Sequence, residues 1–214
     1  MNHCILIVSA FLFLANPYLK GQTSPATASK QTVYGEFGLG FGQTLFFGDM
    51  DAKLINSYGG TFSPGIGNNL SMGFYVAPPN WRGLGIGSRI KGTFGTPVEG
   101  DNGDDYIFNY YNLAASIKYY GLSKQFNRGL YTRGSIGFGQ FTTKRQNEDE
   151  QLYKHQYAIG LSYMGGIGYT LPARRTAVSF ELEFEYANRN GTIDGMGEQN
   201  FQSGQIGGNL TISF

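Results

Sequence analysis

Carboxylates are the most regularly spaced groups in this sequence that have the capacity for chemistry. In the stretch SFELEFEY, Glu181, Glu183 and Glu185 occupy every second position, and large apolar residues lie between them. Neighbouring carboxylates can act as general acids and bases, bind cations or pair with buried basic groups. Because side chains alternate between the two faces of a β-strand, a strand here has all three carboxylates on one face. The sequence therefore predicts a strand with one charged face and one oily face.

The other candidates for chemistry are weak. His155 is the only histidine after residue 3, and catalysis by a nucleophile needs a base beside that nucleophile. The segment DNGDD offers Asp101, Asp104 and Asp105 as oxygen ligands for a divalent cation, without the spacing of an EF-hand. We expect a solvated loop there rather than a metal site, and we expect no cofactor and no enzymatic activity.

Composition favours β structure. Glycine makes up 33 of 214 residues and aromatic residues 15%, whereas charged residues are 14%, against a typical value of about 25%. The net charge of +1 creates no overall field that attracts nucleic acid. Because Cys4 is the single cysteine, the chain cannot form an internal disulfide.

The N-terminal residues have the character of an export signal. Residues 4–15 form an apolar run that is too short to cross a membrane as a helix. Cleavage is expected after Gly21, with Ala15 or Ala28 as alternatives. No Lys or Arg precedes the apolar run, which leaves a buried N-terminal strand or an uncleaved anchor as alternatives. The expected organisation is a signal peptide over 1–21, a flexible leader over 22–32 and a β-barrel over 33–214.

From Val33 onward, an alternation of apolar residues with small, mostly glycine residues recurs eight times between turn signals. Three connections are short and four are longer and more polar. An even number of strands joined alternately by short turns and long loops is the layout of an outer-membrane barrel. The short turns are expected at 78–83, 121–129 and 172–176, and the long loops at 48–68, 95–105, 143–154 and 187–200.

Charged residues follow the same division. Eleven of the 15 acidic residues fall in the long loops, and the short turns contain five basic residues and no acid. Arg189 is assigned to the edge of the last long loop, and no charge is left for the apolar face. The remaining charges of the strands lie on the glycine-rich face, four of each sign: Glu36, Arg89, Lys91, Lys118, Arg133, Glu181, Glu183 and Glu185.

This distribution distinguishes two kinds of barrel. A soluble barrel with an oily interior would carry far more charge on its outer face. Eight balanced charges among glycines suit a lumen of compensated ions, with the apolar face toward lipid. In an eight-stranded ring the seventh strand lies opposite the third, so the three glutamates are expected to face Arg89 and Lys91. A soluble barrel remains the alternative.

Residues 33–214 resemble, as a pattern, the small eight-stranded outer-membrane barrels of the OmpA and OmpX type, within the outer membrane protein beta-barrel domain grouping. The tail GGNLTISF is the most specific element, because Leu210, Ile212 and Phe214 match the C-terminal signal that such proteins present to the barrel-assembly machinery. The resemblance implies an all-β, eight-stranded antiparallel up-and-down transmembrane β-barrel. It also implies export by a cleaved signal peptide to the outer membrane of a Gram-negative bacterium, with outer-membrane lipid as a partner.

The function expected from these features is non-enzymatic. A barrel with a filled, charge-compensated lumen and acidic surface loops suits a structural or surface-interaction role, with an extracellular ligand or lipopolysaccharide at the loops. A narrow porin-like channel is the alternative, although side chains fill the interior of most eight-stranded barrels. A lipid-modifying enzyme is disfavoured, because lipid A deacylase barrels carry His directly before Ser, and Gln156 follows His155 here.

Overall fold

The computed structural model describes residues 31–47, 66–95, 98–99, 105–146, 154–173, 176–193 and 197–214. Over these ranges, the structure contains no helix with the length and apolar character needed to span a membrane.

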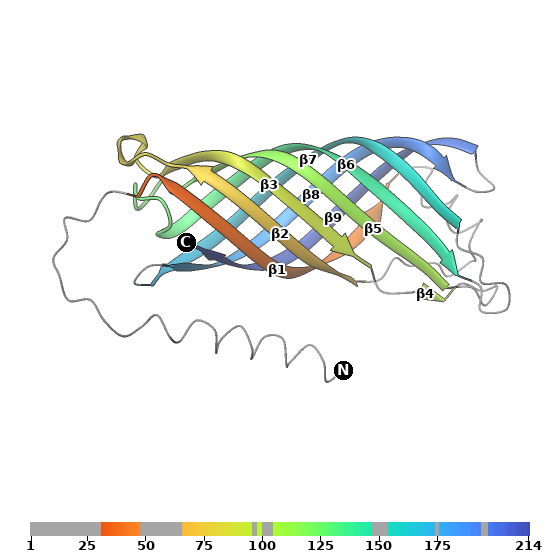
Figure 1. The fold of residues 1–214 in the computed structure, drawn as a ribbon, viewed down its shortest axis with the longest axis horizontal. Helices are drawn as coiled ribbons and strands as arrows, with labels where there is room; N and C mark the ends of the chain where they lie inside the picture. Colours follow the sequence, from red (N-terminus) through yellow and green to blue (C-terminus); the bar gives the residue numbers. More distant parts are fainter. Residues whose placement is uncertain are drawn as a thin grey trace. The chain divides into compact units, whose positions relative to one another are not determined.

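Eight antiparallel strands close into a barrel (Figure 1). Each strand pairs with its neighbour along the chain, and β9 pairs with β1 to close the ring. The short strand β4 (Val98–Glu99) pairs only with the end of β5. The expected eight-stranded antiparallel barrel is therefore confirmed. The strands of the ring are β1 (Val33–Phe46), β2 (Ile66–Val76), β3 (Leu84–Phe94), β5 (Asp105–Tyr119), β6 (Gly129–Gln146), β7 (Lys154–Pro172), β8 (Ala177–Ile193) and β9 (Gly197–Ser213).

The strands are strongly tilted. A row of paired residues that leaves β1 at Glu36 passes around the other seven strands and returns to β1 at Phe46, ten residues further on (46 − 36). A stagger of ten residues of ~3.3 Å, around eight strands spaced ~4.8 Å apart, inclines each strand by roughly 40°. The interior of such a barrel is only wide enough for its own side chains.

The two faces of the barrel wall differ in character. Most outward side chains are large and apolar, and Leu182 exposes 68% of its surface. Inward positions carry mostly small residues, which make room for the few long ones. A Cβ added at Gly85 would lie 2.2 Å from the ring of Phe126, and one added at Gly168 would lie 2.5 Å from the ring of Tyr131. The inward glycines therefore leave the space that large lumen side chains occupy.

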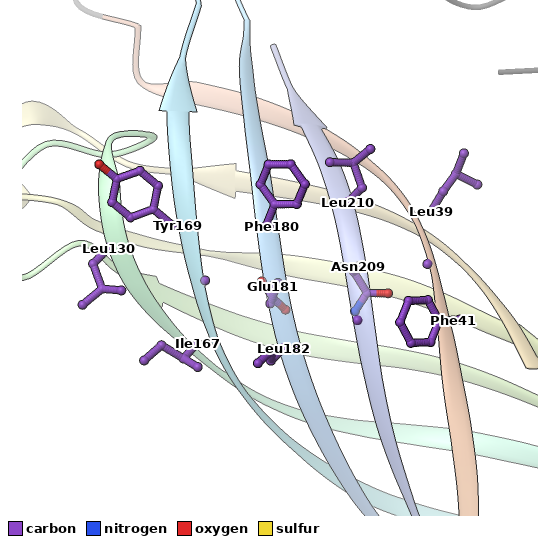
Figure 2. A pocket seen from close by; sticks show the side chains of 13 residues that line it. Leu39, Phe41, Leu130, Ile167, Tyr169, Phe180, Glu181, Leu182, Asn209 and Leu210 are labelled. Carbon is purple, nitrogen blue, oxygen red and sulfur yellow. The ribbon is translucent and has the colours of Figure 1, made fainter. Parts of the chain in front are cut away.

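A shallow groove crosses the outer face over β1, β9, β8, β7 and β6 (Figure 2). Gly208 opens it, because this residue has no side chain between Phe41 and Leu182, its partners on the neighbouring strands. Figure 2 shows the apolar side chains of the groove, among them Phe180 and Leu210, projecting from the barrel wall. Even where it is hollowed, the outer surface presents almost only apolar groups.

The three short connections and the C-terminus lie at one end of the barrel (Figure 1), here named the turn end. At the other end, the loop end, the sequence placed a boundary wrongly. Residues 187–200 were expected to be a loop, but β8 and β9 stay paired as far as Ile193 and Gly197. A hairpin beyond the apolar belt can be polar on both faces, so alternation no longer marks where its strands end. In the same way, β6 and β7 extend into the predicted loop 143–154.

Candidate functional site: a charge ladder in the lumen

Charged side chains of the strands gather inside the barrel. Wherever the structure describes the side chain of a charged strand residue, that side chain is inward and at most 5% exposed. Such burial is costly for an ion unless opposite charges and hydrogen bonds compensate it. The nine residues are Glu36, Arg89, Lys91, Lys118, Arg133, Glu181, Glu183, Glu185 and Arg189.

The part of this group nearer the turn end begins with Glu36. One oxygen of its carboxylate pairs with Lys118, and the other lies 2.9 Å from Arg133. The same Arg133 nitrogen lies 3.2 Å from Glu181, and the other oxygen of Glu181 lies 3.9 Å from Arg89. Glu36 and Glu181 are therefore each shared by two cations.

Toward the loop end, positive and negative side chains continue to alternate. Arg89 pairs with one oxygen of Glu183, and Lys91 lies 2.5 Å from the other. Lys91 also lies 3.5 Å from Glu185, whose second oxygen is 2.8 Å from Arg189. The contacts thus form one unbranched series of alternating charge, here named the charge ladder: Lys118, Glu36, Arg133, Glu181, Arg89, Glu183, Lys91, Glu185 and Arg189.

Strand β8 positions one side of the ladder. Glu181, Glu183, Glu185 and Arg189 follow one another along β8, all with the inward orientation that even spacing gives. Eight residues of ~3.3 Å at a tilt of roughly 40° rise about 20 Å along the barrel axis. Arg89 and Lys91 complete the middle from β3, on the opposite side of the ring. The spacing in SFELEFEY thus sets three carboxylates at successive heights in the lumen.

The ladder begins and ends with a cation, and an aromatic cluster lies beside each one. At the turn end, Lys118 Nζ lies 4.2 Å from the ring centroid of Tyr131 and 5.7 Å from that of Tyr120. The turn after β5 directs Phe126 toward this group, and its ring is 5.2 Å from Tyr120 and 4.8 Å from Tyr34. A cation over aromatic faces gains about 0.5–2 kcal/mol. Tyr120 and Tyr131 are buried, so these rings fill space in the lumen beside Lys118.

A second cluster lies toward the loop end. The guanidinium of Arg189 is 5.5 Å from the ring centroid of Tyr110, which packs on Phe141 at 4.9 Å. Phe108 stacks on Phe141 at 5.7 Å, and Phe46 meets both rings edge-on. Each terminal cation, which has one carboxylate partner in the ladder, therefore gains an aromatic partner.

The structure brings all eight lumen residues named from the sequence into the ladder, and it adds Arg189. Sequence reasoning missed this residue because β8 was expected to end before it. Its even spacing from Glu185, four positions away on the same strand, was the available signal. Phe126 was missed as well, because a residue in a turn carries no alternation that indicates its direction.

The structure does not test the acidic candidates of the segment DNGDD. Asp101 and Asp104 lie outside the described residues, as does the side chain of Asp105 at the start of β5. Over the ranges that the structure describes, no three His, Cys, Asp or Glu side chains are grouped as metal ligands. In the ladder itself, each carboxylate lies within 4 Å of two basic groups. Its chemistry is mutual compensation of charge.

Comparison with known proteins supports the fold of the chain. No known protein family matches the sequence, and no curated protein sequence matches it. In structure, the chain is similar to Ail, the attachment invasion locus protein of Yersinia pestis, in complex with the heparin analogue sucrose octasulfate. The TM-score is 0.54 at 16% sequence identity, over 86% of this chain and 100% of that one.

A second similar structure is Neisserial surface protein A (NspA). Its TM-score is 0.50 at 10% identity, over 85% of this chain and 97% of that one. At these identities the likeness concerns the fold. The resemblance read from the sequence is confirmed at that level: the chain has the fold of the small eight-stranded outer-membrane β-barrels.

Proposed function

We propose that this protein is a non-enzymatic outer-membrane barrel with a structural or surface-interaction role. The observation that carries the proposal is that charged side chains face the inside of the barrel and apolar side chains face the outside. Each charged strand residue whose side chain the structure describes points into the lumen, and most of the large side chains on the outside are apolar. A soluble barrel needs the reverse arrangement, since its outer face must meet water.

The height of the apolar surface supports a membrane location. On β1, outward apolar residues occur from Val33 to Leu45, and Gln43 is the polar side chain among them. Twelve residue steps of ~3.3 Å at a tilt of roughly 40° rise about 30 Å. The hydrocarbon core of a bilayer has a similar thickness of about 30 Å. Export by a signal peptide over 1–21, a leader over 22–32 and assembly through Leu210, Ile212 and Phe214 complete this proposal.

A filled lumen favours a structural or interaction role over a channel. The charge ladder occupies the middle of the barrel, and an aromatic cluster lies beside the cation at each of its ends. An ion that entered would have to displace carboxylate–cation pairs in an enclosed space, where breaking such a pair typically costs about 3–5 kcal/mol. The ladder therefore acts as a plug that stabilises the barrel.

The long loops are the proposed interaction surface. Ail, a structural neighbour, was solved with a polysulfated ligand. The loops of this chain carry 11 acidic residues by sequence, so they repel a polyanion. A basic ligand suits them, as does a lipopolysaccharide phosphate bridged by divalent cations. The loops of this chain are therefore expected to favour a ligand of the opposite charge to the one in the Ail structure.

The sequence also supports a role without catalysis. His155 is the only histidine after the proposed signal peptide, and Gln156 follows it. Nucleophilic catalysis needs a base in contact with a nucleophile. A lipid-modifying activity therefore has no evident catalytic pair.

Topology is open to direct labelling. Cys4 is the only cysteine and belongs to the proposed signal peptide, so an introduced cysteine is the only thiol of the mature chain. In intact cells, a membrane-impermeant thiol reagent is expected to label Asp104→Cys, in a long loop, and not Arg174→Cys, in a short turn. The reason is that long polar loops of such barrels face outward. Labelling of Arg174→Cys alone would reverse the orientation.

Conductance separates the structural role from a channel. In planar bilayers, the wild-type barrel is expected to give no steady open-pore current, because side chains fill its lumen. The double variant Arg89→Ala/Glu183→Ala removes a pair from the middle of the ladder, and we expect more frequent current steps from it. A porin prepared in the same detergent serves as the positive control. A steady wild-type current that scales with salt would establish the channel alternative.

A further inference from the structure

Two of the short turns form one basic surface at the turn end of the barrel. We propose that this surface, made of Trp81, Arg82, Leu122, Lys124 and Arg128 and here named the turn patch, binds the headgroups of anionic glycerophospholipids. The proposal rests on the membrane location proposed above, and it adds a class of lipid and the residues that contact it.

The backbones of the two turns are in contact. The N–H of Tyr120 donates a hydrogen bond to the carbonyl oxygen of Gly83 at 3.0 Å, and the N–H of Lys124 donates to that of Tyr120 at 3.0 Å. A Cβ at Gly83 would lie 2.7 Å from the Tyr120 oxygen and 3.1 Å from the carbonyl carbon of Lys124. The exposed side chains of Arg82 and Lys124 therefore extend from one packed unit.

Both of these cations occupy unusual backbone conformations. Arg82 has a φ of 49° and Lys124 a φ of 54°, in the left-handed region. Residues with a Cβ are uncommon there, and Gly or Asn is the usual choice. Asn127, with a φ of 61°, follows that preference. The N–H of Arg82 ends the turn Pro79–Trp81 by donating to the carbonyl oxygen of Pro79, which any residue but proline could do. The choice of a long basic side chain at this uncommon conformation points to a role for that side chain.

The turn patch has charge of a single sign. Arg82, Lys124 and Arg128 are exposed, and neither 78–83 nor 121–129 contains an acidic residue. Arg128 makes a neutral contact, in which it donates to the side-chain oxygen of Gln125 at 3.4 Å. The ligand of this surface must therefore supply negative charge.

The distance of the turn patch from the apolar belt distinguishes lipid phosphates from an anionic polymer in the water beyond. The two turns follow directly on strands of the apolar belt and can extend at most about 10–15 Å beyond them. The headgroup layer of a bilayer is about 5–8 Å deep on each side. Trp81 is 38% exposed and Leu122 80% exposed, and amphipathic rings such as the indole of Trp81 are typical of that layer. Basic groups at this depth meet lipid phosphates, whereas a polymer in the water beyond requires longer connections.

The single tryptophan makes the proposal testable in the whole folded barrel. Trp81 is the only tryptophan of the chain, so its fluorescence reports on the turn patch alone. The barrel is folded into vesicles that contain phosphatidylglycerol or phosphatidylcholine with the same nitroxide label near the headgroup. Each cation near the surface enriches an anionic lipid by about fivefold at low salt. We expect the anionic label to quench Trp81 about threefold more than the zwitterionic label, and this excess to disappear near 1 M salt.

Two triple variants provide the matched comparison. Arg82→Gln/Lys124→Gln/Arg128→Gln is expected to quench equally with both lipids, whereas Lys144→Gln/Arg145→Gln/Lys154→Gln removes as many cations near the loop end and keeps the preference. Equal quenching of the wild type by the two labels overturns the proposal, as does an equal loss of preference in both triple variants. Binding of the wild type to purified cell-wall polymer without a lipid preference assigns the patch to that polymer instead. Failure of the wild type to insert into any vesicle contradicts the membrane location itself.

Discussion

Glu183→Ala is expected to destabilise the folded barrel by about 3–5 kcal/mol, because it leaves two buried cations without their nearest carboxylate. Glu183 pairs with Arg89 through one oxygen and lies 2.5 Å from Lys91 through the other. The partners that remain are more distant, at 3.9 Å for Arg89 and 3.5 Å for Lys91. Urea unfolding in detergent or vesicles, followed by the gel mobility of unboiled protein, measures this loss.

Leu182→Ala is the matched control on the adjacent residue. Leu182 faces outward, so the change removes only apolar transfer of about 2 kcal/mol. Glu183→Gln keeps the shape of the side chain and tests the charge alone, and we expect it to destabilise nearly as much as Glu183→Ala. If Glu183→Ala unfolds like the wild type while Leu182→Ala collapses, the two faces have been exchanged.

A double variant tests whether the ladder acts as a unit. Arg89→Ala is expected to be about as harmful as Glu183→Ala, since it leaves a carboxylate short of a cation. The combination Arg89→Ala/Glu183→Ala removes one charge of each sign, and we expect it to cost less than the sum of the two single changes. Additive losses would mean that the two side chains act independently.

Leu182→Arg is expected to cost about 2–4 kcal/mol, because it puts a charge on the lipid face near the middle of the bilayer. The apolar outward residues of β8 run from Val178 to Tyr186, and Leu182 is the central one. The measurement is again urea unfolding, with the barrel folded into vesicles. A lower yield of folded protein is expected from the same cause.

Leu122→Arg is the control that separates the hydrocarbon core of the bilayer from its headgroup layer. Leu122 is 80% exposed and Leu182 68% exposed, so exposed area alone predicts similar, small effects of both changes. Leu122 belongs to a turn beyond the strands, where a surface substitution typically changes stability by about 0.5 kcal/mol or less. Equal effects of the two substitutions would mean that neither residue faces the hydrocarbon core, and would contradict the membrane location.

Local patterning explains how much was predictable. The direction of a strand side chain depends only on its position along the strand, so alternation identified the apolar and polar faces and most of the charged lumen residues. Where polarity no longer alternates, this information is lost. The end of β8 and the inward position of Arg189 were therefore missed. Phe126 was missed for the same reason, since its turn has no period.

The pairing inside the lumen was decided only by the tertiary structure. Glu36 meets Arg133, which is 97 residues away along the chain, and Lys118, which is 82 residues away. Which cation reaches which carboxylate depends on the position of each strand along the barrel axis. That position follows from the stagger that accumulates over all eight strands. The sequence by itself determined that these charges share an interior, because polarity is a local property. Their order in the ladder is a property of the closed ring, because contacts across the lumen exist only once every strand has its register.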